Sequence, residues 1–265
     1  MARPTETRET FAVDSPLMMR TITIAGAKGG TAKTTTVLNL AAALAADGYR
    51  VGVADCDPQS TATLGMRRPP VADPITAVPS LVESAGWPNG CLLLAGGRTL
   101  VSATRAEVRN HLTGRALHDQ LDVLLVDTVP AVSEIVLASL DVADLVIIPF
   151  KPEPFSVPGL ADMLATARHV RATARLRALA TMVQERRGAT ARTLEKVEHQ
   201  HPGTLYRTQV PDDAAVVNAS ERYASVIAHS PRSRAAAAYV AVGAEIAADL
   251  GLRAAKPTRP AATVS

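Results

Sequence analysis

The sequence predicts an α/β fold of the doubly wound type, with a mostly parallel sheet and helices on both faces. Strand-like apolar segments alternate with segments of helical periodicity along the chain. The strand-like segments at 121–127 and 145–149 are almost continuously apolar, as expected for strands buried on both faces of a parallel sheet. A glycine-rich turn joins the first strand-like segment to the first helical one. In such folds, ligands bind at the carboxyl ends of the parallel strands.

The predicted strands and helices follow in a regular order. Each strand is expected where β-branched and apolar residues run together, and each helix where apolar residues recur at helical spacing. Gly48 follows the first helix and Pro231 opens the last, as these residues favour helix ends. The segment 65–97 has the weakest pattern, and we expect a loop with one short helix there. The expected strands are 20–26, 50–55, 121–127, 145–149, 179–183 and 205–210, and the expected helices are 34–47, 104–120, 133–143, 159–175, 191–201 and 231–250.

Length and composition predict one folded domain. The chain has 265 residues, of which 47% are hydrophobic and 20% charged, a balance typical of globular proteins. We expect the domain to span 20–252, between a flexible N-terminal arm at 1–19 and a flexible C-terminal tail at 253–265. No apolar run approaches the roughly 20 residues of a membrane helix, and residues 1–15 lack the apolar stretch of a signal peptide. We therefore expect a cytoplasmic protein with no membrane partner.

Composition also excludes several classes of site. Cys56 and Cys91 have no second cysteine or histidine at ligand spacing, which excludes a disulfide framework and a zinc ribbon. Aromatic residues make up only 3% of the chain, so a stacking platform for single-stranded nucleic acid is not expected. The segment 168–207 holds nine Lys or Arg against three Glu, although the net charge of the chain is only +3. This imbalance permits an anionic partner, and solvated helix faces explain it equally well.

The loop at 26–35, Gly-Ala-Lys-Gly-Gly-Thr-Ala-Lys-Thr-Thr, predicts a phosphate-binding site. Gly29 and Gly30 allow backbone conformations that turn successive N–H groups toward one anion. The helix that begins near Lys33 adds its positive N-terminal end. Lys33 can reach the β- and γ-phosphates of a nucleotide, the Thr34 hydroxyl can bind Mg²⁺, and Thr35 lies near the α-phosphate. An ordinary glycine-rich turn is the alternative interpretation.

Carboxylates at predicted strand ends suit a magnesium-nucleotide site. Asp127 ends a predicted buried strand, where it can hold a water molecule on Mg²⁺; the alternative is a cap for the next segment. Asp55 ends another predicted strand and can support the metal shell. A guanine-reading Asn/Thr-Lys-x-Asp motif is absent after the strand expected at 179–183, so elimination favours adenine as the base.

Three motifs resemble those of the ParA/MinD family of deviant Walker A ATPases, and most closely those of Soj-like ParA partition ATPases. Lys28-Gly-Gly-x-x-Lys-Thr-Thr35 resembles the deviant Walker A motif, Ala-Asp-Cys-Asp-Pro-Gln at 54–59 the Walker A′ box, and Leu-Leu-Val-Asp-Thr at 124–128 the Walker B motif. The resemblance covers about 20–250 and implies a P-loop NTPase fold of the SIMIBI type. Val129 departs from the family, in which a proline usually follows the Walker B motif.

The resemblance also assigns roles to individual residues. It implies that Lys28 crosses a dimer interface to the partner's nucleotide, and that Asp57 orients the attacking water. A solvated loop lysine and a simple Asp-Pro turn are the respective alternatives. The implied residues are catalytic Lys28, Lys33 and Asp57; metal-binding Thr34, Asp57 and Asp127; and nucleotide-binding Lys28, Gly29, Gly30, Thr31, Ala32, Lys33, Thr34 and Thr35, with Met182, Pro211 and Asp213 beside the adenine.

For partners, the resemblance implies an ATP-dependent homodimer that binds double-stranded DNA without sequence preference and works with a ParB-like adaptor. Arg207 stands where ParA relatives supply a DNA-contacting arginine, but Ala215 replaces the second one, so Arg222, Arg232 and Arg234 are candidates to substitute. Solvated surface arginines are the alternative. The Val210–Ser220 loop is closer to that of MinD, and no membrane-binding amphipathic helix is visible at the C-terminal end.

The function implied is slow, partner-stimulated hydrolysis of ATP with Mg²⁺ as cofactor, converting ATP and water into ADP and phosphate. Such an ATPase drives plasmid or chromosome partition, or cargo positioning, and associates with the nucleoid. A MinD-like ATPase that positions another cargo is the alternative within the family. A nucleotide-sensing scaffold with negligible turnover is the alternative outside it.

Overall fold

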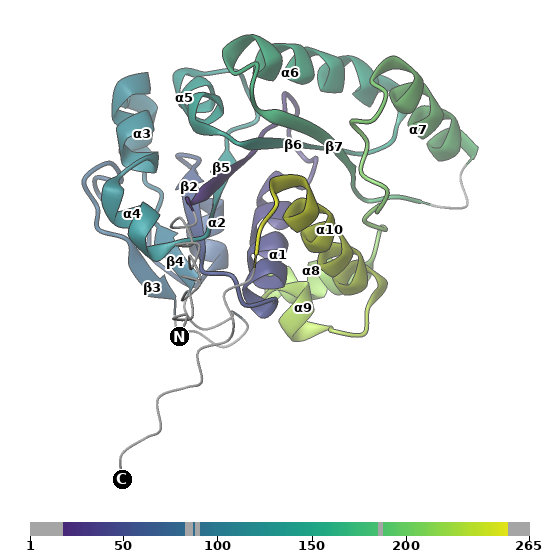
Figure 1. Ribbon diagram of the computed structural model, residues 1–265. Coiled ribbons are helices and arrows are strands. Elements are labelled where there is room, and N and C mark those ends of the chain that lie inside the picture. The colour runs from purple at the N-terminus through teal and green to yellow at the C-terminus, as the bar shows by residue number, and fades with distance from the viewer. Residues whose placement is uncertain (1–17, 83–86, 88–90, 185–187, 254–265) are drawn as a thin grey trace, which may run out of the picture.

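The computed structural model describes residues 18–82, 87, 91–184 and 188–253. A seven-stranded sheet runs through this part of the chain, with strand order β3-β4-β2-β5-β1-β6-β7 (Figure 1). Neighbouring strands are parallel except β3 and β4, which are antiparallel. The fold class predicted from the sequence is confirmed. The strands are β1 (Arg20–Ile24), β2 (Val51–Cys56), β3 (Ser80–Val82), β4 (Cys91–Leu94), β5 (Val123–Thr128), β6 (Leu145–Phe150) and β7 (Arg175–Ala180).

Helices cover both faces of the sheet (Figure 1). On one face α1 and α10 pack against each other with α9 beside them, and on the other face α5 contacts both α3 and α6. None of the described helices is long and apolar enough to cross a bilayer. The α-helices are α1 (Lys33–Ala46), α2 (Thr61–Gly65), α3 (Arg105–Leu112), α4 (Arg115–Gln120), α5 (Glu134–Val142), α6 (Val157–Val170), α7 (Gly188–Gln200), α8 (Ala214–Glu221), α9 (Val226–His229) and α10 (Arg234–Leu250), with 3₁₀ turns η1 (Arg98–Ser102) and η2 (Pro154–Ser156).

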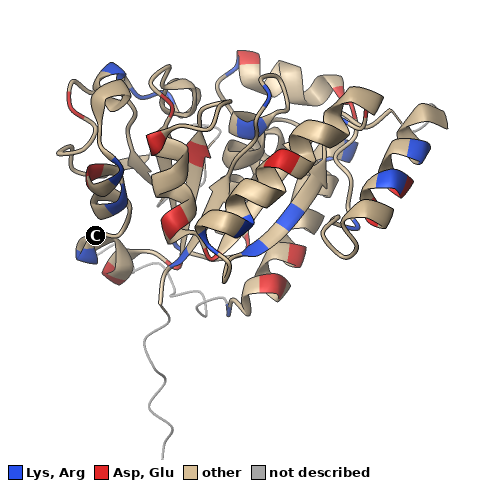
Figure 2. Ribbon diagram, turned by 90° about the horizontal axis from the view of Figure 1, so that it is seen from above, with Lys and Arg blue, Asp and Glu red and all other residues tan. Residues whose placement is uncertain are grey.

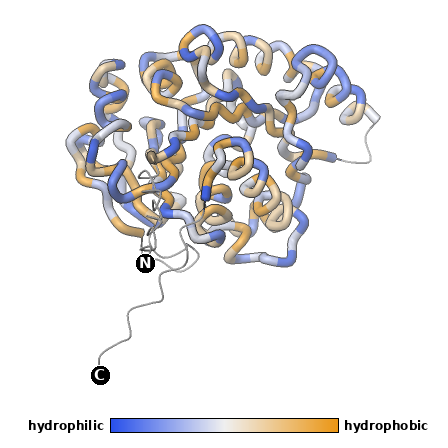
Figure 3. Tube along the Cα trace, in the orientation of Figure 1, coloured by the Kyte–Doolittle hydropathy of each residue, from blue (hydrophilic) through white to orange (hydrophobic). Residues whose placement is uncertain are grey.

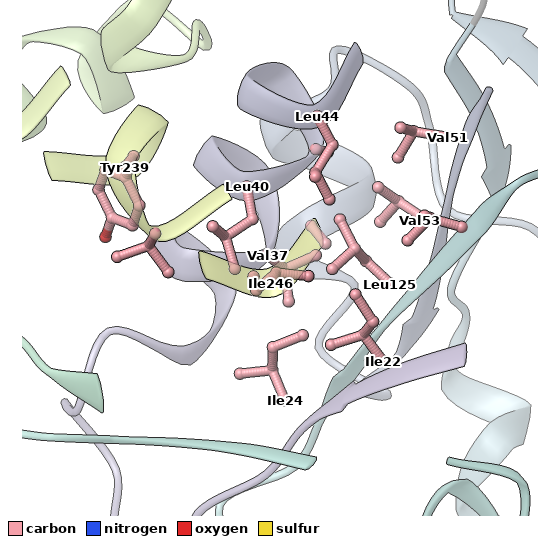
Figure 4. Close-up of a cluster of buried hydrophobic side chains, with 14 of the residues drawn as sticks. Ile22, Ile24, Val37, Leu40, Leu44, Val51, Val53, Leu125, Tyr239 and Ile246 are labelled. Carbon is pink, nitrogen blue, oxygen red and sulfur yellow. The ribbon is translucent and has the colours of Figure 1, made fainter. Parts of the chain in front are cut away.

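Alternation along the central strands supplies hydrophobic cores on both faces of the sheet. In β6, Leu145 and Ile147 face the core beneath α1 and α10, whereas Val146 and Ile148 face the core beneath α5 and α6. Successive side chains of a strand point to opposite faces, so a strand buried on both sides is apolar throughout. Figure 3 shows hydrophobic residues concentrated along these strands, and Figure 4 shows the first core around α1 and Tyr239. The central strands are therefore buried on both faces.

Several boundaries differ from those predicted. The expected helix at 104–120 is two helices, α3 and α4, and the expected strand at 205–210 makes only isolated bridges, through Leu205 and Pro211. The helices α8 and α9 were not predicted. The prediction of a loop with one short helix at 65–97 is wrong, because β3 and β4 lie in this segment. These strands are three and four residues long, which is too short to show a clear periodicity, and pairing holds them: β4 pairs with β2, and β3 pairs with β4. The predicted arm and tail fall almost entirely outside the described residues.

The edge strand β7 begins four residues earlier than its predicted start. Its first residue, Arg175, is the last residue of the helix expected at 159–175, and residues 176–178 were expected in neither element. In the structure, Arg175 and Arg177 both form ion pairs with Asp249 of α10, at 2.8 and 2.6 Å. The tertiary partner explains why two arginines are tolerated in this strand.

Candidate functional site

The carboxyl ends of β1, β2 and β5 bring three loops together at one edge of the sheet. Asp55 of β2 and Asp127 of β5 are register partners, and Asp127 is also the register partner of Ile24, the last residue of β1. The loop between β1 and α1 contains the predicted phosphate-binding segment. The chain thus places the three motifs, which are separated by up to about a hundred residues, around one site.

The phosphate loop has the backbone shape of an anion cradle. Gly30 has φ of 72° and Ala32 has φ of 64°, so two residues of the loop are in the left-handed region. Ala32 is also the N-cap of α1, where no side chain caps the helix and no acidic residue occupies the first turn. The first N–H groups of α1 are therefore available to an anion, and the helix dipole favours negative charge there.

The two lysines of the loop differ in placement. Lys33 is buried, and its Nζ donates a hydrogen bond to the carbonyl oxygen of Lys28 at 3.3 Å. Burial lowers the pKa of Lys33, while the negative charges of Asp127 and Asp57 act in the opposite direction. The side chain of Lys28 is exposed and makes no hydrogen bond or ion pair with the described residues. One lysine thus faces the site and the other faces outward.

Thr34 and Asp127 form the centre of the site. The Thr34 hydroxyl donates to Oδ2 of Asp127 at 2.7 Å, and Oδ1 of Asp127 is buried without a hydrogen-bond partner in the described chain. Burial, with the negative charge of Asp55 as the next cause, raises the pKa of Asp127 to about 8. A buried carboxylate oxygen without a partner is costly unless a cation or a donor satisfies it. A hydroxyl and a carboxylate beside a phosphate loop therefore fit Mg²⁺.

The other two carboxylates differ in their contacts. Asp57 is half-buried at the loop after β2, and its Oδ1 accepts the backbone N–H of Gln59 at 2.8 Å. Asp55 is buried, and its two oxygens accept hydrogen bonds from the Asp57 N–H and from the N–H and hydroxyl of Thr63. The Asp55 carboxylate thus forms hydrogen bonds within the protein, and its support of a metal shell stays a prediction.

A mostly apolar cavity of about 270 Å³ adjoins the phosphate loop. It is lined by Ala32 and Thr35 from the loop and by all three residues predicted to flank a base, Met182, Pro211 and Asp213. Its lining also includes Tyr239 of α10, which the sequence analysis did not identify, because no local motif marks it.

Two of the residues predicted for the base site have clear structural features. Met182 has φ of 50°, a left-handed conformation that is unusual for this residue type. The Asp213 carboxylate accepts the N–H groups of Ala215 and Ala235, at 3.0 and 3.2 Å. The Asp213 carboxylate therefore joins the starts of α8 and α10.

The predicted DNA-contacting arginines are separated. Arg207 is exposed in a hollow that also contains Glu198, Glu245 and Asp249. Arg222 lies in a different hollow, next to Arg67, which donates a hydrogen bond to its carbonyl oxygen at 2.7 Å. Arg232 and Arg234 stand at the start of α10, whereas Glu245, which binds the Arg207 backbone, is eleven residues along that helix, or about 16 Å. Figure 2 shows basic and acidic residues interspersed in its view.

The chain is similar to a nucleotide-binding family and to several of its members. The sequence profile of the CobQ/CobB/MinD/ParA nucleotide binding domain matches residues 22–226. The sporulation initiation inhibitor protein Soj of Bacillus subtilis is 30% identical over 252 residues, covering 88% of this chain and 100% of that protein. The chromosome-partitioning ATPase Soj of Thermus thermophilus is 34% identical over 240 residues, covering 87% and 96%. The fold is similar to that of the septum site-determining protein MinD of Pyrococcus horikoshii complexed with Mg-ADP, with a TM-score of 0.72, 18% identity, and coverage of 86% and 96%.

Proposed function

The chain belongs to the CobQ/CobB/MinD/ParA nucleotide-binding family, and from this premise we propose that it is a ParA-type ATPase with ATP and Mg²⁺ as cofactors. It hydrolyses ATP slowly, and a ParB-like partner stimulates hydrolysis. ATP drives dimerisation, and the dimer binds double-stranded DNA without sequence preference. The cargo is a plasmid, a chromosome or another assembly.

The observation that carries this proposal is the pair formed by Thr34 and Asp127. Its hydroxyl–carboxylate hydrogen bond of 2.7 Å lies at the start of α1, and the second carboxylate oxygen is buried without a partner in the described chain. Thr34 and Asp127 would hold the magnesium ion, Asp127 through a water molecule. When bound, the ion neutralises charge on the β- and γ-phosphate oxygens.

The remaining residues act by position and charge. Lys33 and the loop N–H groups bind the β- and γ-phosphates, and the cavity beside Met182 and Pro211 receives the adenine. Asp57 orients the attacking water from the loop after β2. Lys28, whose side chain is exposed, enters the partner's site in the dimer and stabilises the charge that develops during phosphoryl transfer.

The DNA-binding surface is proposed to combine Arg207, Arg222, Arg232 and Arg234. Arg207 and Arg222 are exposed, as DNA phosphate contacts require. In a two-fold dimer each arginine occurs twice, so hollows that are separate in one copy can contribute to one footprint. We propose that the DNA-bound dimer is associated with the nucleoid.

Replacing each loop lysine tests the proposal. Lys33→Ala should weaken binding of labelled ATP by roughly a hundredfold, because it removes a charged donor to the phosphates. Lys28→Ala should leave the affinity within about threefold but lower turnover by at least about a hundredfold, as for removal of a cation supplied in trans. Equilibrium binding and steady-state phosphate release measure the two quantities, and Lys196→Ala, an exposed lysine on α7, is the matched control.

Full turnover in Lys28→Ala would exclude the lysine in trans. Tight Mg-dependent binding of ATP without turnover, with and without DNA and the partner, would instead support a nucleotide-sensing scaffold. Sedimentation with liposomes but not with DNA would favour the MinD-like alternative.

A further inference from the structure

The loop after β2 carries Asp57 and is held from beneath by a buried cluster. Within the loop, the N–H of Ser60 donates to the carbonyl oxygen of Asp57 at 2.8 Å, which closes a turn over residues 57–60. The N–H of Asp57 donates to Oδ1 of Asp55 at 3.2 Å. The position of Asp57 therefore depends on where the Asp55 carboxylate is held.

Thr63 in α2 holds that carboxylate. Its N–H and its hydroxyl both donate to Oδ2 of Asp55, each at 2.7 Å. The Thr63 side chain is fully buried, and its hydroxyl oxygen accepts the N–H of Gly96 at 2.8 Å. One hydroxyl thus links three segments: β2, α2 and the segment after β4.

The packing around Gly96 leaves no room for a side chain at this position. A Cβ atom at this position would lie 2.9 Å from Cγ of Asp55 and 3.0 Å from Oγ of Ser60. Gly96 is therefore required by its close approach to the cluster, and a larger residue would displace the carboxylate that Thr63 holds.

The local chain does not favour the observed turn. Ser60 has φ of 55° and is almost fully buried, and its hydroxyl neither caps α2 nor finds another partner in the described chain. A left-handed conformation at a non-glycine residue carries a cost that surrounding contacts must offset. The Thr63 cluster supplies such contacts directly beneath the turn.

We propose that Thr63 is a positioning residue for Asp57: its hydroxyl, bridging Asp55 and Gly96, fixes the loop so that the Asp57 carboxylate faces the phosphate site. This inference rests on the proposed function, in which Asp57 orients the attacking water. Asp57 lies close enough to Lys33 for its charge to act on the ammonium group. Within the described chain, Thr63 forms no hydrogen bond with the loop 26–32, so its effect passes through Asp55.

Thr63→Val and Thr63→Ser test the proposal. Valine keeps the shape and removes the hydroxyl, so turnover of Mg·ATP should fall by about tenfold or more while the dissociation constant for labelled ATP stays within about twofold, since a small misplacement penalises chemistry more than binding. Serine keeps the hydroxyl and should restore turnover. Gly96→Ala should lower turnover as valine does, because its methyl group would press on Asp55.

A second readout needs no nucleotide. In the nucleotide-free protein, backbone amides of 57–60 should exchange hydrogen faster in Thr63→Val than in wild type, and serine should restore their protection. Thr193→Val is the matched control, because Thr193 is also a buried threonine, but among the described residues its hydroxyl bonds only the Ala189 carbonyl of its own helix.

Wild-type turnover in Thr63→Val would overturn the proposal, as would an equal loss in Thr193→Val. A parallel loss of ATP affinity and thermal stability would also overturn it, by assigning Thr63 a purely structural role. If wild type itself shows no turnover, the proposed function fails; the exchange measurement then decides alone whether Thr63 holds the loop.

Discussion

The phosphate loop and the exposed arginines are two regions with opposite organisation. In the phosphate loop, the side chains of Lys33 and Thr34 are held by hydrogen bonds to Lys28 and Asp127, and the backbone is fixed between a buried strand and α1. The predicted DNA-contacting arginines lie in two hollows and at the start of a helix. The side chains of Arg207 and Arg222 are exposed.

The difference follows from the chemistry each region is proposed to perform. Phosphoryl transfer depends on atoms placed within fractions of an ångström, so its residues must be rigidly supported. Binding of DNA without sequence preference depends on the sum of charge near phosphates, and this sum tolerates scattered, solvated side chains. A substitution in the phosphate loop should therefore cause a large loss of ATP binding or turnover. A substitution of one arginine should cause only a small change in DNA affinity.

After the loop lysines, Asp127→Asn should have the largest effect. The variant should lose the Mg²⁺-dependent part of ATP affinity, about tenfold or more, because an amide replaces the charged oxygen that would hold the ion's water shell. Titration of labelled ATP with and without EDTA measures this. Asp119→Asn, a change at an acidic residue on the α4 surface, should leave the magnesium effect intact. If the ATP affinity of Asp127→Asn depended on Mg²⁺ as in wild type, Asp127 would be excluded as a metal-site residue.

The next largest effect is the pH dependence that Asp127 gives to the stability of the protein. Its folded pKa of about 8 lies above its ordinary value of 3.8, so between these values the folded state holds the proton more tightly than the unfolded state. The contribution of Asp127 to stability is therefore present at low pH and is lost as pH rises through this window. The melting temperature of the metal-free protein, relative to Asp127→Asn, should fall between pH 5 and pH 8 and level off above pH 8. A constant difference between the two proteins would contradict the burial argument.

Each arginine should make a small, separate contribution to DNA affinity. For a dimer, Arg207→Ala should flatten the slope of log affinity for DNA against log salt by roughly 2, since each phosphate contact contributes about −0.9 and occurs twice. Arg222→Ala should give the same change if both hollows belong to one footprint. Arg98→Ala, an exposed arginine in η1, is the control. A slope unchanged by Arg207→Ala would exclude that residue from the surface.

The smallest effect is expected within the loop itself. Ala32 adopts φ of 64°, so Ala32→Gly should stabilise the protein by about 0.5–1 kcal/mol, which is the relief of left-handed strain less the entropy cost of glycine. Ala244→Gly, at an exposed position inside α10, should instead destabilise it by about 1 kcal/mol. Chemical denaturation of both variants measures these changes. Equal losses in the two would show that Ala32 is not strained.

Much of the nucleotide site could be predicted because its residues are close in sequence. The loop at 26–35 lies between β1 and α1, so strand, turn and helix dipole together determine where its N–H groups point. Asp127 was predictable for a related reason, since the ends of buried parallel strands meet at one edge. Met182, Pro211 and Asp213 line one cavity, to which the structure adds Tyr239, and their place beside a base stays a prediction.

The sequence alone determined the fold class, because it depends on periodicity. It also determined the order of the motifs that follow the central strands and the residue types of the phosphate loop, because these depend on neighbouring residues. Only the tertiary structure decided how Asp55, Thr63 and Gly96 meet, since these residues come from three segments whose contacts no local pattern records. It also decided that Arg175 and Arg177 belong to a strand, because Asp249 of α10 pairs with them. Long-range partners determine such features, and the free energy of those contacts exceeds the weak local preferences that the sequence displays.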